Sequence, residues 1–541
     1  MKLRNILSAA ALSLFTLGLT SCVGDLHVDS INPQQEQALN LDALFNKMYA
    51  NLSVTGQKGP DGNGDLDDID EGTSGLIRNL WNLNELSTDE AKCIWGDPGI
   101  PELNHNSWSD AHPLSQALYY RLYFGITLAN HYLEETEGSS DTNVLTQRAE
   151  ARFMRALHYY YLLDLYGNVS IVEKISKDLS SQSTRSQVFE FIEKELKAIV
   201  GEGGSNEVLA DKRAKYGRAD KVAGYMLLAR LYLNSAVYTG TARWQEAKTY
   251  ADKVIASSYH LNTTGTSTYS AFQLLFMGDN DTNGAQDEIL LPALYDGQQT
   301  QSWGGTLFIL ASTINSKVTD PAKGNYPVGT TQAWGGNRTT KQFAMKFFDE
   351  KEKVPEGNPF VVAKYAKDDR ALFYTLERKM SMSDEGDFEK GFGYIKFLNV
   401  HAKTGSPSDD RFMDTDFPML RVAEAYLTSA EADARMNNGA CTSDGVSKIN
   451  ALRARANAAA VTAFDLEDLC DEWAREFAFE AIRRPTLIRF GKFGGQIGYK
   501  WEWMGGDKEG ARFSENFNIF PIPVNVLNTN GNMKQNPGYA D

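Results

Sequence analysis

Apolar residues recur with the spacing of buried helices through the middle and the end of this chain. In residues 147–166 every fourth position is apolar, and a glycine follows that can end a helix in a left-handed conformation; these positions are Phe153, Leu157, Tyr161, Leu165 and Gly167. The same spacing predicts helices at residues 222–233 and 244–255, and a further pair at residues 420–436 and 446–455. The pattern therefore predicts a mainly α fold built from helical pairs.

Two of the predicted helices carry a small residue close to a large aromatic one. Ala229 lies near Tyr232, and Ala247 lies near Tyr250. This arrangement resembles the tetratricopeptide repeat, in which helical pairs stack so that neighbours share one core. We therefore expect a tetratricopeptide-like scaffold of helical pairs.

Two stretches interrupt the helical pattern, at about residues 57–101 and 270–416. They are rich in Gly, Asn, Asp and Thr, and their apolar runs are short, as at residues 289–291 and 306–311. This composition is typical of loops and short strands. Because loops on a rigid scaffold carry most binding residues, we expect a loop-rich lobe with short strands to hold the functional site.

The chain begins with the pattern of a secretory signal peptide. Two basic residues among the first four precede an apolar run over residues 6–19, and LTSC follows at residues 19–22. This ending resembles the lipobox of bacterial lipoproteins, in which cleavage leaves the cysteine first and acyl chains are attached to it. We expect residues 1–21 to be removed, Cys22 to be lipidated, and residues 22–541 to form a single domain that carries both loop-rich stretches as insertions.

Composition and charge exclude several classes of protein. The 541 residues are 42% hydrophobic, which suits a chain that buries a large core. Acidic residues outnumber basic ones 70 to 54, so the net charge of −16 disfavours binding to nucleic-acid phosphates. Mean hydropathy is −0.40, and no long apolar run follows the first one. We therefore expect neither nucleic-acid binding nor a membrane-spanning helix.

The sequence lacks the common catalytic fingerprints. It has no GxGxxG after a strand, no GxxxxGK[ST], no HExxH and no GxSxG, and none of its seven histidines has another three or four positions away. Nucleotide-dependent and zinc-protease chemistry are therefore disfavoured, and no catalytic residue is assigned. A pair of carboxylates for glycoside hydrolysis cannot be found by sequence spacing, because such residues meet only in the folded chain.

Four ordered blocks of sequence carry a resemblance to a known family. The blocks are RAEARFMRALHYYYLLDLYG at residues 148–167, DFPMLRVAEAYL at residues 416–427, REFAFEAIR with LIRFG at residues 475–491, and FPIP with QNPGY at residues 520–539. Together with the lipobox they resemble the SusD-like (RagB/SusD) outer-membrane glycan-binding lipoproteins along the whole chain. Two positions depart from the family pattern: Ala481 replaces a usual Gly and Thr486 a usual Asp.

Within the family the resemblance is greatest to its starch-binding branch. The matching segments are VTGQK at residues 54–58, DEGTSG at residues 70–75, NELSTDE at residues 84–90, GRADK at residues 217–221 and WEW at residues 501–503. The resemblance implies a non-catalytic lipoprotein, anchored at the outer-membrane cell surface of a Bacteroidetes-type bacterium. It would capture a polysaccharide or oligosaccharide, starch or maltooligosaccharides first, for a SusC-like TonB-dependent transporter, alongside other surface glycan-binding lipoproteins.

Two alternatives stay open at this stage. The first is an outer-membrane glycoside hydrolase that uses the same aromatic residues. The second is a tetratricopeptide scaffold that binds protein and no glycan, for which the tryptophans of the loops would have to be buried.

Glycine-flanked tryptophans are the first candidates for a sugar site, because a pyranose ring offers an apolar face that stacks on flat aromatic side chains. Trp95, Trp303 and Trp334 each precede glycine in a loop-rich stretch, and by resemblance they match the aromatic arc of the starch-binding branch.

Three polar residues complete the predicted glycan site. Asp70 and Arg78 match family positions that contact ring hydroxyls. The two carboxylate oxygens of Asp accept hydrogen bonds and the guanidinium of Arg donates them, so the pair suits neighbouring hydroxyls of a sugar ring. By resemblance, an asparagine belongs just after the third aromatic, Trp95. It is missing here because the segment is one residue shorter, so Asp97 is the candidate to replace it.

A calcium site is predicted where two acidic turns meet. Residues 279–284 read DNDTNG, which begins like an EF-hand loop, but Leu290 stands where the twelfth ligand belongs. Carboxylates from elsewhere would have to complete the site, and related SusD proteins resemble this arrangement with calcium joining the loops. The predicted ligands are Asp281, Asn283, Asp414 and Asp416; the alternative is a solvated acidic turn.

Overall fold

The structure is a computed structural model that describes residues 39–67, 69–320 and 326–539. The chain divides into two units after Leu44, and the residues from Phe45 onward form one compact unit, to which the following description applies. The predicted signal segment 1–21 and the lipidation site Cys22 lie outside the described residues.

The described part of the chain is mainly helical, as predicted. Its helices are α2 (Leu41–Ala50), α3 (Leu76–Trp81), α4 (Ile100–Asn104), α5 (Pro113–Glu135), α6 (Thr142–Leu165), α7 (Arg185–Ile199), α8 (Lys221–Leu233), α9 (Ser235–Thr239), α10 (Trp244–Ile255), α11 (Ala271–Leu274), α12 (Gly305–Thr313), α13 (Lys341–Ala344), α14 (Pro359–Ala366), α15 (Val422–Met436), α16 (Ser443–Arg455), α17 (Leu466–Phe477), α18 (Arg483–Arg489) and α19 (Val524–Thr529). None of these helices is both long enough and apolar enough to span a bilayer.

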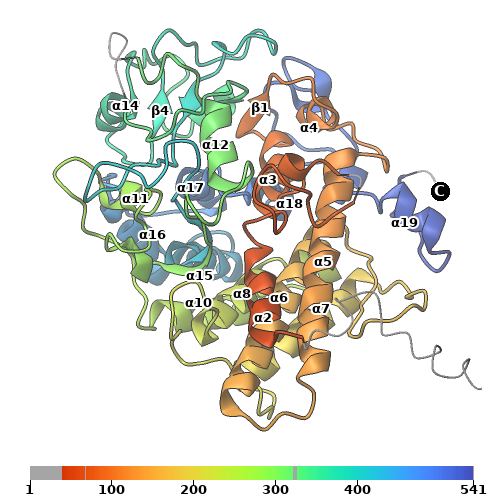
Figure 1. Cartoon of the computed structure of the whole chain (residues 1–541). Coiled ribbons are helices and arrows are strands. Elements are labelled where there is room, and N and C mark those ends of the chain that lie inside the picture. Colours follow the sequence, from red (N-terminus) through yellow and green to blue (C-terminus); the bar gives the residue numbers. More distant parts are fainter. Residues whose placement is uncertain (1–38, 68, 321–325, 540–541) are drawn as a thin grey trace, which may run out of the picture. The chain divides into compact units, whose positions relative to one another are not determined.

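Successive long helices pack against one another in pairs. Helix α5 packs on α6, α6 on α7, α8 on α10, α10 on α15 and α15 on α16, so every helical pair expected from the spacing forms (Figure 1). Helix α6 buries Phe153, Leu157 and Leu165, and Gly167 follows it with a φ of +68°. The finer likeness to tetratricopeptide repeats stays a prediction.

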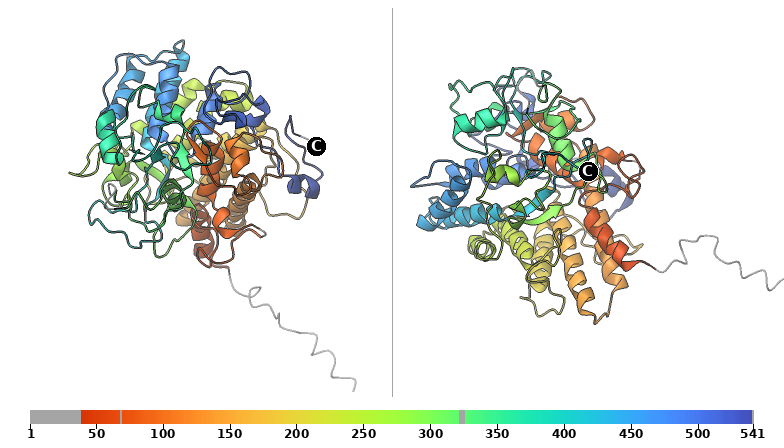
Figure 2. Two further views of the ribbon diagram at one scale, coloured as in Figure 1. Left: turned by 90° about the horizontal axis from the view of Figure 1, so that it is seen from above. Right: turned by 60° about the vertical axis from the view of Figure 1, so that its left-hand side comes forward.

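Helices and loops gather in different places. The helices between residues 113 and 255 lie together, and the loop-rich residues 270–416 lie at the other end, as the right-hand view of Figure 2 shows. The strands of the described chain form three antiparallel pairs: β1 (Ala91–Cys93) with β3 (Asn337–Thr339), β2 (Ile289–Ala293) with β6 (Phe417–Arg421), and β4 (Phe373–Tyr374) with β5 (Gly393–Tyr394). Pairing of β1 with β3 brings the segment after Cys93 beside the segment before Asn337.

The first loop-rich stretch is more ordered than the sequence pattern predicts. It is irregular only as far as Gly75, where α3 begins and continues into a π-helical turn over Asn82–Leu86. Every residue of that turn is buried, including Asn82, Asn84 and Glu85. A run of polar residues usually indicates a solvated loop. The helical turn was missed because polar side chains are buried in it together with the apolar ones.

A network of buried ion pairs connects the helical region with the loop-rich region. Arg421, at the end of β6, donates hydrogen bonds to Glu480 on both carboxylate oxygens (2.8 and 2.7 Å), to Glu476 (2.8 Å) and to Glu288 (3.2 Å). These four residues are at most 4% exposed, and Arg455 at the end of α16 donates to two of the carboxylates, Glu288 and Glu476. The family-like blocks DFPMLR and REFAFE therefore meet in one place.

The departure from the family pattern at Ala481 has a backbone consequence. Ala481 adopts a φ of +62° just before α18, a region that costs an L-residue with a Cβ about 1–2 kcal/mol. A glycine, the usual family residue, has no such cost. The alanine is 7% exposed, so its methyl group contributes some packing in return.

We expect Ala481→Gly to raise the free energy of unfolding by about 1 kcal/mol, because it removes the left-handed strain. Ala478→Gly is the matched control: Ala478 is buried at a φ of −45°, and its replacement should lower stability. Urea denaturation of the parent and both variants measures the effect. A denaturation midpoint for Ala481→Gly at or below that of the parent would contradict the argument.

Candidate functional site

One buried arginine fixes both ends of the loop that forms the site. Arg121 of α5 donates to the backbone oxygen of Thr55 (3.1 Å) before the loop and to the backbone oxygen of Ser74 (3.0 Å) after it. It also binds Asp65 within the loop (3.2 Å), which pairs with Lys47 as well (2.6 Å). Because Arg121 is fully buried, the loop starts and ends on a fixed part of the scaffold.

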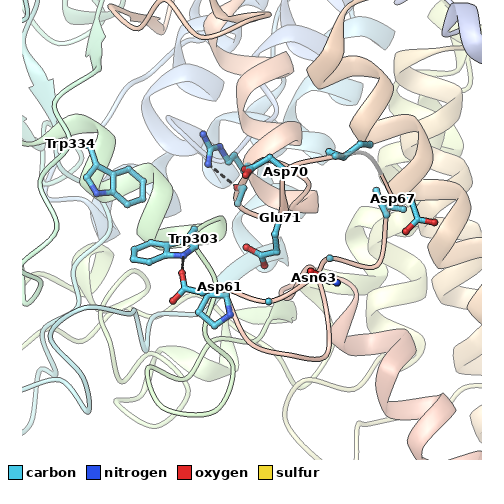
Figure 3. A pocket seen from close by; sticks show the side chains of 14 residues that line it. Asp61, Asn63, Asp67, Asp70, Glu71, Trp303 and Trp334 are labelled. Carbon is cyan, nitrogen blue, oxygen red and sulfur yellow. Dashed lines mark hydrogen bonds between the residues drawn. The ribbon is translucent and has the colours of Figure 1, made fainter.

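The loop closes one side of a pocket of about 670 Å³. Its lining comes from residues 60–64, 66–67 and 69–72, with Arg78 of α3 and the indoles of Trp303 and Trp334. Figure 3 shows the two indoles on one side of the pocket and the carboxylates of Asp61, Asp70 and Glu71 across from them or below. The structure therefore brings four of the six predicted glycan-binding residues, Asp70, Arg78, Trp303 and Trp334, to one pocket.

Helix α12 positions both indoles. Trp303 comes just before the helix, and the backbone N–H groups of residues 334–336 donate to the carbonyls of its last turn, such as Trp334 N–H to Ala311 (2.7 Å). A helix end leaves such carbonyls without partners, which is why the turn docks there. The ring centroids of Trp303 and Trp334 lie 6.2 Å apart at 51°, and both side chains are half-buried. Two inclined apolar faces therefore border the pocket.

Trp303 is held by groups that the sequence analysis did not find. Its Nε1 donates to Asp61 (2.9 Å), its ring packs on Phe412 at 4.8 Å, and the guanidinium of Arg411 lies 4.5 Å from the ring centroid. The segment with Arg411 and Phe412 is more than 100 residues away in sequence, so no local pattern indicates this contact.

Asp70 and Arg78 approach each other across a tight turn. Asp70 caps the short 3-10 helix Glu71–Thr73 by accepting the N–H of Thr73 (3.1 Å), and Arg78 Nη1 donates to Gly72 O (2.8 Å). A Cβ on Gly72 would lie 3.4 Å from the Asp70 carboxylate and 3.6 Å from Trp303, so this turn passes close to both. The remaining oxygens of Asp70 can accept hydrogen bonds from a ligand in the pocket.

Glu71 is a pocket residue that the sequence analysis missed, although it stands next to Asp70 in the matching block. Burial and the charges of Asp70 and Asp61 raise its pKa to about 7, and Arg121 opposes this. One of its carboxylate oxygens is buried without a hydrogen-bond partner among the described residues. Glu71 therefore takes up a proton more readily than an ordinary carboxylate, and it can donate or accept a hydrogen bond in the pocket.

The other two predicted residues, Trp95 and Asp97, lie beside the pocket and not in its lining. Trp95 Nε1 donates to Gly335 O (3.0 Å), directly behind Trp334. A Cβ on Gly336 would come within 2.4 Å of the Trp95 ring, so only glycine admits this approach. Trp95 is half-buried, and its ring packs edge-on to Phe308 (6.2 Å), over which Arg78 also lies (4.7 Å). Asp97 is exposed, and its charge acts on Arg78.

The predicted calcium ligands are brought together only in part. Burial, then Asp281 and Asp414, raise the pKa of buried Asp416 well above its usual value, so the three carboxylates lie within electrostatic range. Asn283 instead serves its own turn, where its amide binds Leu274 O and Ala285 N–H, both at 2.9 Å. Over the described ranges, no three His, Cys, Asp or Glu side chains are arranged to hold a metal ion.

Comparisons with known proteins identify the family. A family model described as "SusD family" matches residues 298–539, and one described as "Starch-binding associating with outer membrane" matches residues 26–233. A protein named "Starch-binding protein SusD" from Bacteroides thetaiotaomicron is 38% identical, over 99% of this chain and 99% of its own.

Solved structures agree on the fold. A SusD superfamily protein from Parabacteroides distasonis superposes with a TM-score of 0.68 at 19% identity, over 93% of this chain and 100% of its own. A "Laminarin binding SusD-like protein" gives a TM-score of 0.63 at 18% identity, over 92% of this chain and 99% of its own. The chain belongs to the SusD family, as its sequence blocks predict.

Proposed function

We propose that this chain is a non-catalytic glycan-binding lipoprotein of the outer-membrane surface that captures a polysaccharide or oligosaccharide. The observation that carries the proposal is the pocket of about 670 Å³ with two inclined, half-buried indoles facing Asp70, Glu71 and Arg78. Apolar ring faces stack on the indoles, and hydroxyls bridge the carboxylates and the guanidinium.

Starch or a maltooligosaccharide is the proposed ligand. The support is the starch-binding relative from Bacteroides thetaiotaomicron, which is 38% identical over nearly the whole chain. A structural neighbour is named for laminarin, a different glucan, but at 18% identity the similarity supports only the fold. Amylose and laminarin are therefore the two polysaccharides to compare.

Both alternatives make different demands on the structure. A scaffold that binds no glycan requires buried loop tryptophans, whereas Trp95, Trp303 and Trp334 are only half-buried. A glycoside hydrolase would shorten its ligand, so analysis of oligosaccharide products after incubation with the purified protein separates catalysis from capture.

The proposed partner is a SusC-like TonB-dependent transporter, which would receive the captured glycan. Attachment to the outer membrane rests on acylation of Cys22. Acyl chains contribute about 0.8 kcal/mol per buried CH2, so several chains hold a soluble domain at a bilayer.

A structural calcium ion is a second part of the proposal. Asp281, Asp414 and Asp416 supply the oxygen ligands that calcium prefers, and their mutual repulsion would be relieved by a cation. The three carboxylates would move closer around the ion. Asn283 is left out of this proposed ligand set, because its amide binds Leu274 O and Ala285 N–H.

Glycan binding should be lost when both pocket indoles are removed. Each stacked aromatic contributes about 1–3 kcal/mol, and a micromolar to millimolar ligand has about 4–8 kcal/mol in total. We therefore expect Trp303→Ala with Trp334→Ala to abolish amylose retardation in affinity electrophoresis. Trp244→Ala, which removes a half-buried indole of α10, is the control and should bind like the parent. Undiminished retardation of the double variant would mean that these indoles are structural.

Anchoring should depend on one thiol. We expect Cys22→Ala to leave the protein unacylated and free of the outer-membrane fraction after cell fractionation. Cys441→Ala removes another unpaired, partly exposed thiol and should stay in the membrane. Retention of the Cys22→Ala protein in the membrane fraction would exclude this anchor.

Calcium should stabilise the fold. A ligand at one hundred times its Kd adds about 2.7 kcal/mol to stability, so calcium should raise the Tm above that in chelator. Asp281→Asn should remove most of this shift, whereas Asp178→Asn, at another exposed aspartate, should keep it. Equal melting curves of the parent in calcium and in chelator would favour the solvated acidic turn.

A further inference from the structure

A second large pocket lies in the loop-rich part of the chain, apart from the proposed glycan site. It has a volume of about 650 Å³ and is lined by residues 352–356 and by the chain that follows β4. Strand β4, which precedes part of this lining, packs against helix α14 (Figure 1). The lining includes Arg378, Lys353, Lys379, Thr375, Met380 and Phe392.

Arg378 is a buried cation at this pocket. Its side chain is 6% exposed, Nη1 donates to the backbone oxygens of Phe388 (3.0 Å) and Gly391 (3.3 Å), and the guanidinium lies 4.2 Å from the Phe388 ring centroid. Within the described chain, Nε and Nη2 make no hydrogen bond, and no carboxylate lies within ion-pair distance. One edge of the donor fork is therefore available to a ligand.

A second arginine adds to the positive charge. Arg338 is fully buried and donates to the backbone oxygens of Lys390, Lys92 and Glu385, and it too has no ion pair with a described carboxylate. Burial lowers the pKa of each guanidinium to about 10, and in Arg378 the charge of Arg338 contributes.

Nearby carboxylates act on this pair of arginines without an ion pair: Glu385, Asp387 and Asp384 on Arg338, and Glu389 and Asp387 on Arg378. Glu389 pairs with Lys317 and Asp387 with Lys390 (3.5 Å). Glu352 and Glu356 line the pocket itself as exposed residues, as do Lys353 and Lys379, and Glu352 accepts the N–H of Asp349 (3.0 Å).

A buried charge without a directly paired counterion is costly, so two such cations beside a large pocket favour the binding of an anion there. The planar fork of arginine matches two oxygens of a carboxylate, sulfate or phosphate. Val354, Met380 and Phe392 add apolar surface for a carbon skeleton.

We propose that this pocket binds the oxoanion group of a small ligand, with Arg378 as the residue that holds it. The pocket volume leaves room for a sugar acid or a sulfated sugar as well as a free inorganic ion. This inference does not depend on the proposed glycan site, whose residues lie elsewhere.

Isothermal titration of the full mature chain tests the proposal, with ionic strength held constant by sodium chloride. The probes are sulfate, inorganic phosphate and glucuronate, with glucose as the uncharged control. We expect saturable one-to-one binding of at least one oxoanion and binding of glucose at least tenfold weaker. Tighter binding of sulfate or phosphate supports a free ion as the ligand, and tighter binding of glucuronate supports a sugar acid.

Variants assign the binding to Arg378. Arg378→Lys keeps the charge but loses the fork, and it should weaken oxoanion binding at least tenfold while circular dichroism stays unchanged. Arg512→Lys, at an exposed arginine, should bind like the parent. If Arg378→Lys does not fold, an oxoanion-dependent rise in the Tm of the parent at constant ionic strength still supports the site. Absence of saturable binding to the parent, or equal binding to a folded Arg378→Lys, overturns the proposal.

Discussion

The buried ion pairs of Arg421 are the interaction on which the arrangement of this fold depends. Arg421 ends β6, Glu288 precedes β2, and Glu476 and Glu480 lie in and just after α17. Burial alone would raise the pKa of Glu476, but Arg455, Arg421 and Arg370 hold it below its ordinary value. These charges pair with one another, and Lys396 also binds Glu480 (2.6 Å). Removal of one partner from a buried pair costs about 3–5 kcal/mol. Helices and loop-rich segments are thereby fixed in a single arrangement.

The position of the pocket follows from this arrangement through the β2–β6 pair. Strand β6 enters from the segment of residues 411–416, and β2 leaves toward residues 295–303. Asp416 accepts the N–H of Tyr295 (2.7 Å), and Asp414 accepts that of Gly297 (2.8 Å). Phe412, from the same segment, then meets the ring of Trp303. The indole at the edge of the pocket is therefore placed by a chain of contacts that begins at Arg421.

Sequence patterns were sufficient where a feature is local. Four-residue spacing located α6, α8 and α10. One face of α10 is buried, whereas α8 and the second half of α6 are buried on almost all sides. The π-helical turn at Asn82–Leu86 was missed, since its buried polar residues carry no such pattern. The resemblance to the family supplied Asp70, Arg78, Trp303 and Trp334, which do line one pocket. Trp95 was expected in the lining but lies beside it, and Glu71, for which no role was predicted, lines the pocket. These positions depend on the β1–β3 pairing and on a turn, neither of which spacing reveals.

Two arginines of the molecule illustrate why the surroundings of a side chain, and not its type, decide what it can bind. Arg78 also donates only to a backbone carbonyl, that of Gly72, but the carboxylates of Asp70 and Glu71 line the same pocket and act on its charge, so it is suited to uncharged hydroxyls. Arg378 lies beside Arg338, and both donate only to backbone carbonyls and have no ion pair with a described carboxylate. A neutral hydroxyl would leave that positive charge in place, whereas an oxoanion would neutralise it. The same guanidinium group is thus expected to select a neutral glycan in one pocket and an anion in the other.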